Sequence, residues 1–352
     1  MIGSEDLDPL EQDAHSWTEA KNVVSVIGDV PRFFSSTIHY LKKDAREGHS
    51  KMSPLTETYV SQLLRSDSFK AAMYYAGTSY FPERIKDKPF RDPLNLARIY
   101  APDELATIVS LLYLYRRIRK GCDPHLFSEL SSEIVSDVDC GGILGRFLPK
   151  IGILTGLIVG GAPHLGRAMF LGVDKKNYLK YSEYLRKKKL TQLYSMEEQF
   201  WGCNQLQVSI LLLQTLGFGH SIYKTLITGL SCNTLKEAEK DEELYRAKLA
   251  RVWIDSLRDT TQPPQITHKG EFYPLAKDLH QMLELIGEAT KRTDQQSWLN
   301  RGKKDLSPEQ TPELFSPADV TEQKTQTEII QTSDKDLACT EDVDEALNEL
   351  EE

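Results

Sequence analysis

Few residues in this sequence combine a reactive type with a suggestive spacing, and His164 is the first of them. It lies in a glycine-rich stretch, 160–166, which reads GGAPHLG. A glycine-rich turn before a helix can hold a phosphate through backbone N–H groups. This stretch lacks the G-K-[ST] ending of a phosphate-binding loop and follows no clear strand. We therefore predict a structural turn, with His164 kept as a candidate binding residue.

A basic run is the second candidate, and it consists of Arg186, Lys187, Lys188 and Lys189. Tyrosines precede it at three-residue spacing, at positions 178, 181 and 184. Basic residues interleaved with aromatic ones can bind RNA, a nucleotide or an acidic partner. The favoured interpretation is a solvated helix end whose tyrosines pack inward. The run and His164 together form the candidate binding surface.

The five cysteines are the third group of reactive side chains. Their number is odd and no pair has C-x-x-C spacing, so neither a disulfide framework nor a zinc ribbon is expected. Free thiols fit a reducing compartment. The spacing supports no Ser/His/Asp or Cys/His arrangement, so no nucleophile is singled out.

The net charge of −9 limits the classes of partner. Non-specific binding of nucleic acid is not expected, because phosphate contacts need clustered Lys and Arg. The first twelve residues lack the basic and apolar segments of a secretory signal. The longest apolar stretch, 151–163, is too short to span a bilayer. We expect a cytoplasmic protein that does not insert into membranes.

Helices are the elements expected to position these residues. Apolar residues recur three and four positions apart over most of the chain up to about residue 290, and no alternating run requires a sheet. The sequence therefore predicts an all-α fold, with Ile151, Trp201, Leu212 and Leu216 in the core. The predicted helices include 55–64, 69–76, 94–99, 102–120, 125–135, 142–149, 176–189, 196–216, 236–259 and 272–290, with another starting near His220.

The two ends of the chain are expected to differ from the helical body. Residues 1–20 are interpreted as a flexible leader. Residues 293–352 are interpreted as a disordered acidic tail, because a segment so rich in polar residues cannot bury enough apolar surface to offset its ordering entropy. The helices between 22 and 290 should form one body, or two subdomains that meet near 121–142.

Three stretches together resemble the HDOD family of bacterial signalling proteins, whose helical domains are related to the HD metal-dependent phosphohydrolases. In 55–81, LRSDS at 64–68 and AGTSY at 76–80 stand where the family starts a helix and ends it with small residues. Residues 95–118 resemble its long apolar helix, and EQFWGCNQ at 198–205 resembles the start of a later one. The resemblance covers 22–231 and leaves 232–292 as a helical extension packed on the domain. It implies an HD-like helical bundle.

The resemblance also implies that the family's metal ligands are lost. The family's L-L-H-D-I-G stretch corresponds to FLPKIG at 147–152, so Pro149 and Lys150 take the His and Asp positions. Pro149 has no ligand atom, and Lys150 would repel a divalent cation. Gln205 takes the second His position, and residues 228–230 offer no imidazole. The implied protein has no metal, no other cofactor and no catalytic residue.

The expected function is therefore a non-catalytic signalling module that binds a signalling protein or a small ligand, rather than an enzyme. Two alternatives remain open. The first is a residual phosphohydrolase that acts on a nucleotide, with a metal held by Asp137, Asp139, His164 and Glu198. The second is a nucleic-acid-binding regulator that uses residues 186–189, although nucleic acid is not the expected partner.

Overall fold

The fold is all-α, as the sequence predicts. The computed structural model describes residues 9–86, 90, 92–219, 222, 224–231, 234–239, 241–266, 270–291 and 294–302, and these residues contain no β-strand. None of the helices within these ranges has the length and apolarity needed to cross a bilayer. The helices are α1 (Pro9–Ser25), α2 (Arg32–Arg46), α3 (Pro54–Leu63), α4 (Asp67–Tyr80), α5 (Pro82–Ile85), α6 (Pro93–Ala97), α7 (Pro102–Gly121), α8 (Pro124–Phe147), α9 (Gly152–Val173), α10 (Lys175–Lys188), α11 (Tyr194–Trp201), α12 (Gln205–Thr215), the π-helix η1 (Lys224–Gly229), α14 (Leu235–Ala238), α15 (Glu242–Thr260), η2 (Gly270–Phe272), α16 (Ala276–Ala289) and η3 (Asp294–Gln296).

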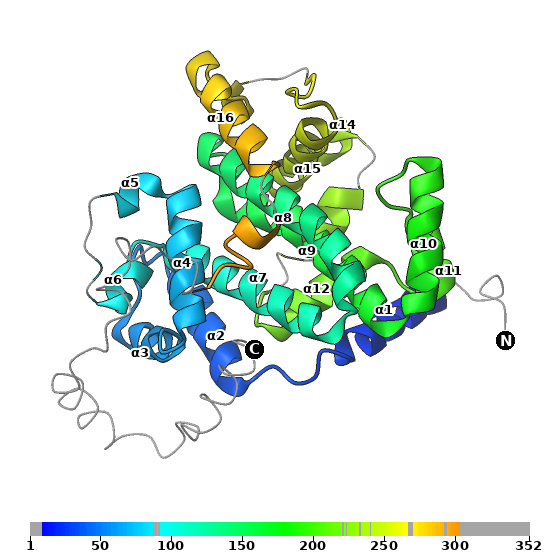
Figure 1. The fold of residues 1–352 in the computed structure, drawn as a ribbon, viewed down its shortest axis with the longest axis horizontal. Helices are drawn as coiled ribbons and strands as arrows, with labels where there is room; N and C mark the ends of the chain where they lie inside the picture. Colours follow the sequence, from blue (N-terminus) through cyan, green and yellow to red (C-terminus); the bar gives the residue numbers. More distant parts are fainter. Residues whose placement is uncertain are drawn as a thin grey trace. The chain divides into compact units, whose positions relative to one another are not determined.

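The chain divides into two compact units. Unit 1 contains the residues up to Asp29 and Ser110–Leu299, whereas unit 2 contains Val30–Val109 and the described residues from Asn300. The boundary predicted near 121–142 is wrong, because that stretch lies inside unit 1 and mostly inside α8. In unit 2, α2 packs on α3, and α6 packs on α3 and α4. Figure 1 shows α2–α6 in blue to cyan.

The long helices α8 and α9 lie side by side at the centre of unit 1 (Figure 1). They are antiparallel, since Gly145 faces Gly152 while Gly141 faces Gly156. A Cβ atom at position 141 would stand 2.1 Å from the backbone oxygen of Gly156, a distance that real Cβ atoms do not reach. Glycine is therefore required for the two backbones to approach so closely.

This packing corrects two predictions. The sequence predicts separate helices at 125–135 and 142–149, but α8 runs unbroken through Gly141 and Gly142. It also predicts a turn at 160–166, but this stretch lies inside α9. A Cβ at Gly160 would stand 2.2 Å from the backbone oxygen of Asp137. Glycine commonly marks a break in a helical pattern, whereas here its small size permits helix-to-helix contact.

The single helix predicted over 196–216 is two helices. The first, α11, ends at Gly202, whose φ of +71° lies in the left-handed region that favours glycine. The second, α12, starts from Asn204, whose side chain accepts hydrogen bonds from the backbone N–H groups of Leu206 and Gln207. The Gln207 side chain accepts from the Asn204 N–H in return, which completes a capping box. The helix predicted over 236–259 is likewise divided into α14 and α15, and His220 lies outside the described residues.

The predicted core residues are confirmed. Ile151, Trp201, Leu212 and Leu216 are all buried. They come from the α8–α9 connection, α11, and α12 with its C-terminal cap, so these segments all contribute to the interior of unit 1.

The flexible leader and the disordered tail predicted at the two ends of the chain are each wrong for the part that the structure describes. The leader is wrong for residues 9–20, because α1 begins at Pro9 and Ala20 is fully buried. The tail is wrong for its first residues, since Trp298 and Leu299 are only 2% and 1% exposed. Residues 1–8 and 303–352 lie outside the described part of the chain.

Candidate functional site

Ionisable side chains from α8, α9 and α15 meet around a buried carboxylate within unit 1, in a group that we call the arginine–carboxylate network. In each helix they are spaced three or four residues apart, which places them on one face. The members are Glu133 and Asp137 from α8, His164 and Arg167 from α9, and Arg251, Asp255 and Arg258 from α15. The network therefore joins three helices that are distant in sequence.

Asp137 is the centre of the network and is 1% exposed. Its Oδ2 atom lies 2.7 Å from His164 Nε2, 2.8 Å from one Arg251 nitrogen and 3.2 Å from one Arg258 nitrogen. Burial alone would raise the pKa of Asp137, but the Arg251 guanidinium and His164 hold it well below its usual range. The carboxylate is therefore ionised at neutral pH.

His164 is neutral in this setting. Burial lowers the pKa of the imidazole, and the opposing attraction of Asp137 does not fully offset burial. Nε2 donates to Asp137, because Nδ1 faces an obligate donor, Arg167, at 3.4 Å. His164 is only 9% exposed. Its predicted place in a binding surface is therefore wrong, since its ring is committed to two partners inside the protein.

The charges of the network nearly balance. Its three carboxylates face three guanidinium groups, and the imidazole adds no charge. Asp259 beside the network also pairs with Arg258 at 3.0 Å, so one negative charge is in excess. Arg167 donates to Glu133 and to the Thr191 backbone oxygen, while Arg251 and Arg258 both bond Asp255. A metal ion at Asp137 would have to displace two guanidinium groups. The arrangement is suited to locking helices together rather than to holding a cation.

The metal set considered from the sequence is only partly assembled. Asp137 and His164 meet, whereas Glu198 accepts a hydrogen bond from Asn204 at 3.1 Å between α11 and α12. Within the described residues, the grouping with metal-like spacing is a different one, in unit 2. It consists of Asp44, Glu47 and His49 at the end of α2.

The positions aligned with the family's ligands also lie apart. Pro149 and Lys150 are exposed between α8 and α9, and Lys150 pairs with Glu271 at 3.1 Å. Gln205 is 4% exposed at the start of α12, and its side chain donates to Gln192 at 2.8 Å.

A distance along α9 shows why these positions cannot share one ion. The Gln205 backbone packs against Gly166, fourteen residues along α9 from Gly152. At 1.5 Å per residue this separation is about 20 Å. Metal ligands lie about 2 Å from their ion, so Lys150 and Gln205 do not mark one lost centre. The alignment of these positions is therefore corrected, while the resemblance to the HDOD family stays a prediction.

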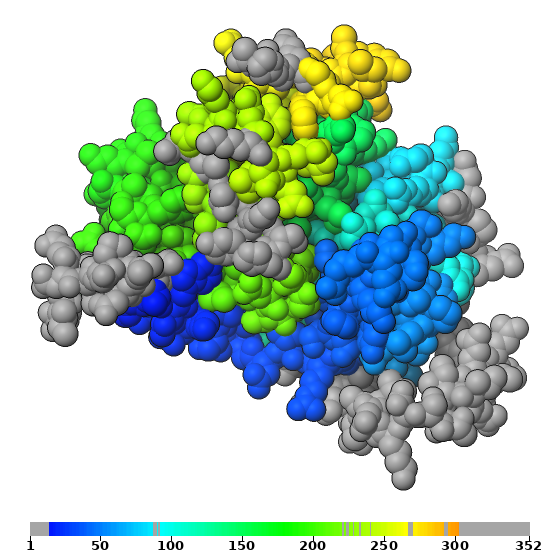
Figure 2. All heavy atoms as spheres, turned by 180° about the vertical axis from the view of Figure 1, so that it is seen from behind, coloured from blue at the N-terminus to red at the C-terminus, as the bar shows by residue number. Residues whose placement is uncertain are grey.

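The basic run predicted at 186–189 belongs to a larger surface on α10. Residues 175–189 contain seven cations and one carboxylate, Glu183. Among the described residues, five of these cations make no ion pair: Lys176, Lys180, Arg186, Lys188 and Lys189. In Figure 2 the green atoms around α10 form an outer edge of unit 1. We call residues 173–190 the α10 surface.

The inward face of α10 is anchored, and part of the tyrosine prediction is confirmed. Tyr178 and Tyr181 are buried, and the Tyr181 ring meets Trp201 edge-on at 5.6 Å. Tyr184, in contrast, is 37% exposed, so its predicted inward packing is wrong. Large apolar side chains are exposed with it on the α10 surface, namely Val173, Leu179 and Leu190.

Glu197 of α11 is a fully buried acid beside the α10 anchor. Its carboxylate accepts from the Tyr181 hydroxyl and, at 2.8 Å, from the Gln205 N–H. Burial raises the pKa of Glu197 to about 7, although both hydrogen bonds oppose this shift. A carboxyl group that is protonated near neutral pH in the fold, but ionised there in the unfolded chain, makes stability depend on pH.

We predict that stability falls between pH 5 and pH 7.5 because of Glu197. The folded pKa lies above the ordinary 4.5, so this group's contribution is fully present below pH 4.5 and is lost as the pH rises through 7. The slope is at most about 1.4 kcal/mol per pH unit. Urea unfolding of Glu197→Gln should show a flatter pH dependence than wild type. The exposed neighbour, Glu198→Gln, should keep the wild-type slope, and equal slopes in all three proteins would contradict the assignment.

Sequence reasoning found His164 and Asp137 but missed the arginines that close the network. One indication was available: His164 and Arg167 are the only ionisable residues in the otherwise apolar α9. An ionisable pair in such a helix needs buried partners. The partners were not identifiable, since Arg251 and Arg258 lie 114 and 121 residues away from Asp137.

Comparison with known proteins assigns no relative to this chain: no protein-family model, no curated protein and no solved structure matches it.

Proposed function

We propose that this chain is a non-catalytic, HDOD-like regulatory module that binds an acidic protein partner through the α10 surface. One observation carries the proposal. Of the seven large apolar side chains that are exposed among the described residues, four lie on the α10 surface, where seven cations also gather. Exposed apolar side chains that gather within a polar rim are typical of an interaction site rather than of an ordinary solvated helix.

The composition of the surface favours a protein over a nucleic acid. Six of the seven cations are lysines, and three of the four exposed apolar residues are aliphatic. Single-stranded nucleic acids are bound largely by aromatic stacking, to which arginine adds. The net charge of −9 also opposes association with a polyanion away from the local patch.

The closed network supports a non-catalytic role. A general base or a metal ligand must reach its substrate or ion. Asp137 Oδ2 instead bonds His164, Arg251 and Arg258 inside the protein, and the other nitrogen of His164 faces Arg167.

A triple charge reversal tests the proposal. We expect Lys176→Glu, Arg186→Glu and Lys188→Glu together to reduce cross-linked partner recovered from a cell lysate by at least about tenfold, since charge reversal turns attraction into repulsion. Quantitative mass spectrometry of the captured proteins measures the loss. The control reverses Lys236, Lys277 and Lys291, exposed lysines of unit 1 outside the α10 surface, and should retain the partner.

Two assays address the alternatives directly. Fluorescence anisotropy with RNA and DNA, repeated at rising salt, would detect a phosphate-binding surface by its steep loss of affinity. A phosphodiester assay with manganese would detect hydrolysis. Specific nucleic-acid binding, turnover, or equal partner recovery by both triple variants would each overturn the proposal.

A further inference from the structure

The three side chains with metal-like spacing in unit 2, Asp44, Glu47 and His49, are brought together by the way in which α2 ends. Asp44 and Glu47 are three residues apart, which places them on one face of the last helical turn. Gly48 follows with a φ of +76°, in the left-handed region that favours glycine. The Gly48 N–H then donates to the Ala45 oxygen at 3.1 Å and the His49 N–H to the Asp44 oxygen at 3.0 Å, which are the two hydrogen bonds of a Schellman motif. This reversal of the chain returns His49 to Asp44.

The distances among these side chains are those of ligands around a metal ion rather than those of hydrogen bonds. His49 Nδ1 lies 3.7 Å from Asp44 Oδ1 and 3.8 Å from Glu47 Oε2, whereas an N–H···O hydrogen bond spans about 2.7–3.2 Å. Ligand atoms that lie about 2.0–2.2 Å from a tetrahedral zinc ion are about 3.4 Å apart. Glu47 also lies 3.9 Å from Lys43, in an exposed pair that costs little to separate. Small rotations of the exposed Glu47 and His49 side chains therefore place all three ligands on one ion.

Asp44 independently indicates a cation, because its negative charge is buried without a cationic partner of its own. The residue is 3% exposed. The Ser53 N–H donates to Oδ2 at 2.7 Å, and the hydroxyl groups of Ser53 and Thr56 also bond the carboxylate, so its ionised form is favoured. Within the described part of the chain, no Lys or Arg lies within ion-pair distance of Asp44, and His49 is the one basic side chain that does. Buried charges are normally paired or bound to a metal ion, and an ion between Asp44 and His49 supplies the missing positive charge.

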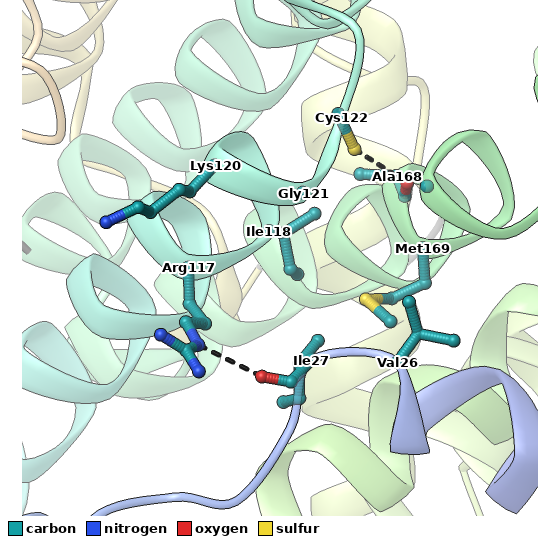
Figure 3. Close-up of a pocket in the computed structure, with 10 residues that line it drawn as sticks. Val26, Ile27, Arg117, Ile118, Lys120, Gly121, Cys122, Ala168 and Met169 are labelled. Carbon is teal, nitrogen blue, oxygen red and sulfur yellow. Dashed lines mark hydrogen bonds between the residues drawn. The ribbon is translucent and has the colours of Figure 1, made fainter. Parts of the chain in front are cut away.

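A pocket of about 190 Å³ in unit 1 offers no comparable set of ligands. It is enclosed by the residues that follow α1, the last turn of α7 with Cys122, and the C-terminal part of α9 (Figure 3). Among the described residues that line it, Cys122 and Met169 carry sulfur, and none is a His, Asp or Glu. Cys122 Sγ donates to the Ala168 backbone oxygen at 3.5 Å. A metal ion is therefore expected at the end of α2 rather than in this pocket.

We propose that Asp44, Glu47 and His49 bind a zinc ion, with water in the remaining coordination position. An imidazole ligand suits zinc, whereas magnesium and calcium prefer sites made of oxygen atoms alone. The ion neutralises Asp44 and ties the residue after the helix turn to the end of α2. The site uses none of the positions that the HDOD resemblance aligns with metal ligands, and it is independent of the partner binding proposed for the α10 surface.

Zinc chloride is the probe, and calcium chloride is its counterpart. Isothermal titration of the full chain should show saturable binding of zinc but not of calcium. His49→Ala should weaken zinc binding by at least about tenfold, since the loss of a group that only orients a metal ligand already costs this much. Glu47→Gln should weaken it on the same scale, and this exposed position avoids the risk that replacing the buried Asp44 unfolds the protein. The matched control is His39→Ala, which removes an exposed histidine of the same helix and should bind zinc as the wild type does.

A second measurement locates the ion. Diethyl pyrocarbonate acylates the free nitrogen of a neutral imidazole, and mass spectrometry measures the modification of each histidine. Zinc on Nδ1 occupies the one lone pair of the neutral ring, so zinc should protect His49 and leave the modification of His39 unchanged. The proposal is overturned if no saturable zinc binding is seen by roughly 1 mM, or if calcium binds equally well. Wild-type zinc affinity in both His49→Ala and Glu47→Gln would overturn it as well, as would unchanged modification of His49 in the presence of zinc.

Discussion

Replacing Asp137 with alanine is expected to lower the free energy of unfolding by about 3–5 kcal/mol. The carboxylate is 1% exposed and faces Arg251 and Arg258, which are 15% and 23% exposed at their side chains. Without this carboxylate, the positive charges of two largely buried guanidinium groups are no longer fully neutralised. An uncompensated buried charge costs more free energy than a lost ion pair at the surface. Urea unfolding followed by circular dichroism measures the change.

Two companion variants separate charge from packing. Asp137→Asn keeps the size of the side chain but loses its charge, so it should retain most of the destabilisation. Asp255→Asn removes a carboxylate that bonds the same two arginines but is 42% exposed, and it should cost less than about 1 kcal/mol. The account fails if Asp137→Ala and Asp255→Asn cost the same.

The same variants bear on function. If the network only joins α8, α9 and α15, folded Asp137→Asn should still bind the acidic partner through the α10 surface. Loss of binding by a folded Asp137→Asn protein would instead connect the network to recognition.

Helical periodicity predicted most of the fold because it depends only on neighbours in sequence. The spacing of apolar residues was enough to place Leu212 and Leu216 in the core and to indicate a helix close to the bounds of α10. The prediction of helix boundaries failed at glycine residues, because glycine can either end a helix or lie within one. At Gly202 the residue ends a helix in the left-handed region, whereas at Gly141 it lies inside a helix against another backbone. Only the facing helix distinguishes the two roles, and a single sequence does not specify it.

For the candidate sites too, the sequence identified residues that are neighbours in the chain but not groups formed by residues far apart. The basic run at 186–189 is contiguous, so it was found from the sequence, and α10 extended it. The network and the pocket each combine segments far apart in the chain. Lys120 and Met169, for example, line one pocket although they lie 49 residues apart in the sequence. Neither residue carries a local pattern that indicates a ligand.

At the end of the described chain, the composition of the sequence predicted the wrong boundary for the tail. The acidic, polar composition beyond residue 293 led to the expectation of a tail, but Trp298 is 2% exposed and the segment around η3 packs on α8. Trp298→Ala should therefore lower the free energy of unfolding by about 3–5 kcal/mol, the usual cost of removing a buried aromatic ring. Trp17→Ala is the matched control, since Trp17 of α1 is only half-buried and should cost less. Circular dichroism during urea unfolding avoids relying on the fluorescence of the removed tryptophan, and a smaller loss for Trp298→Ala than for Trp17→Ala would show that the segment does not stabilise unit 1.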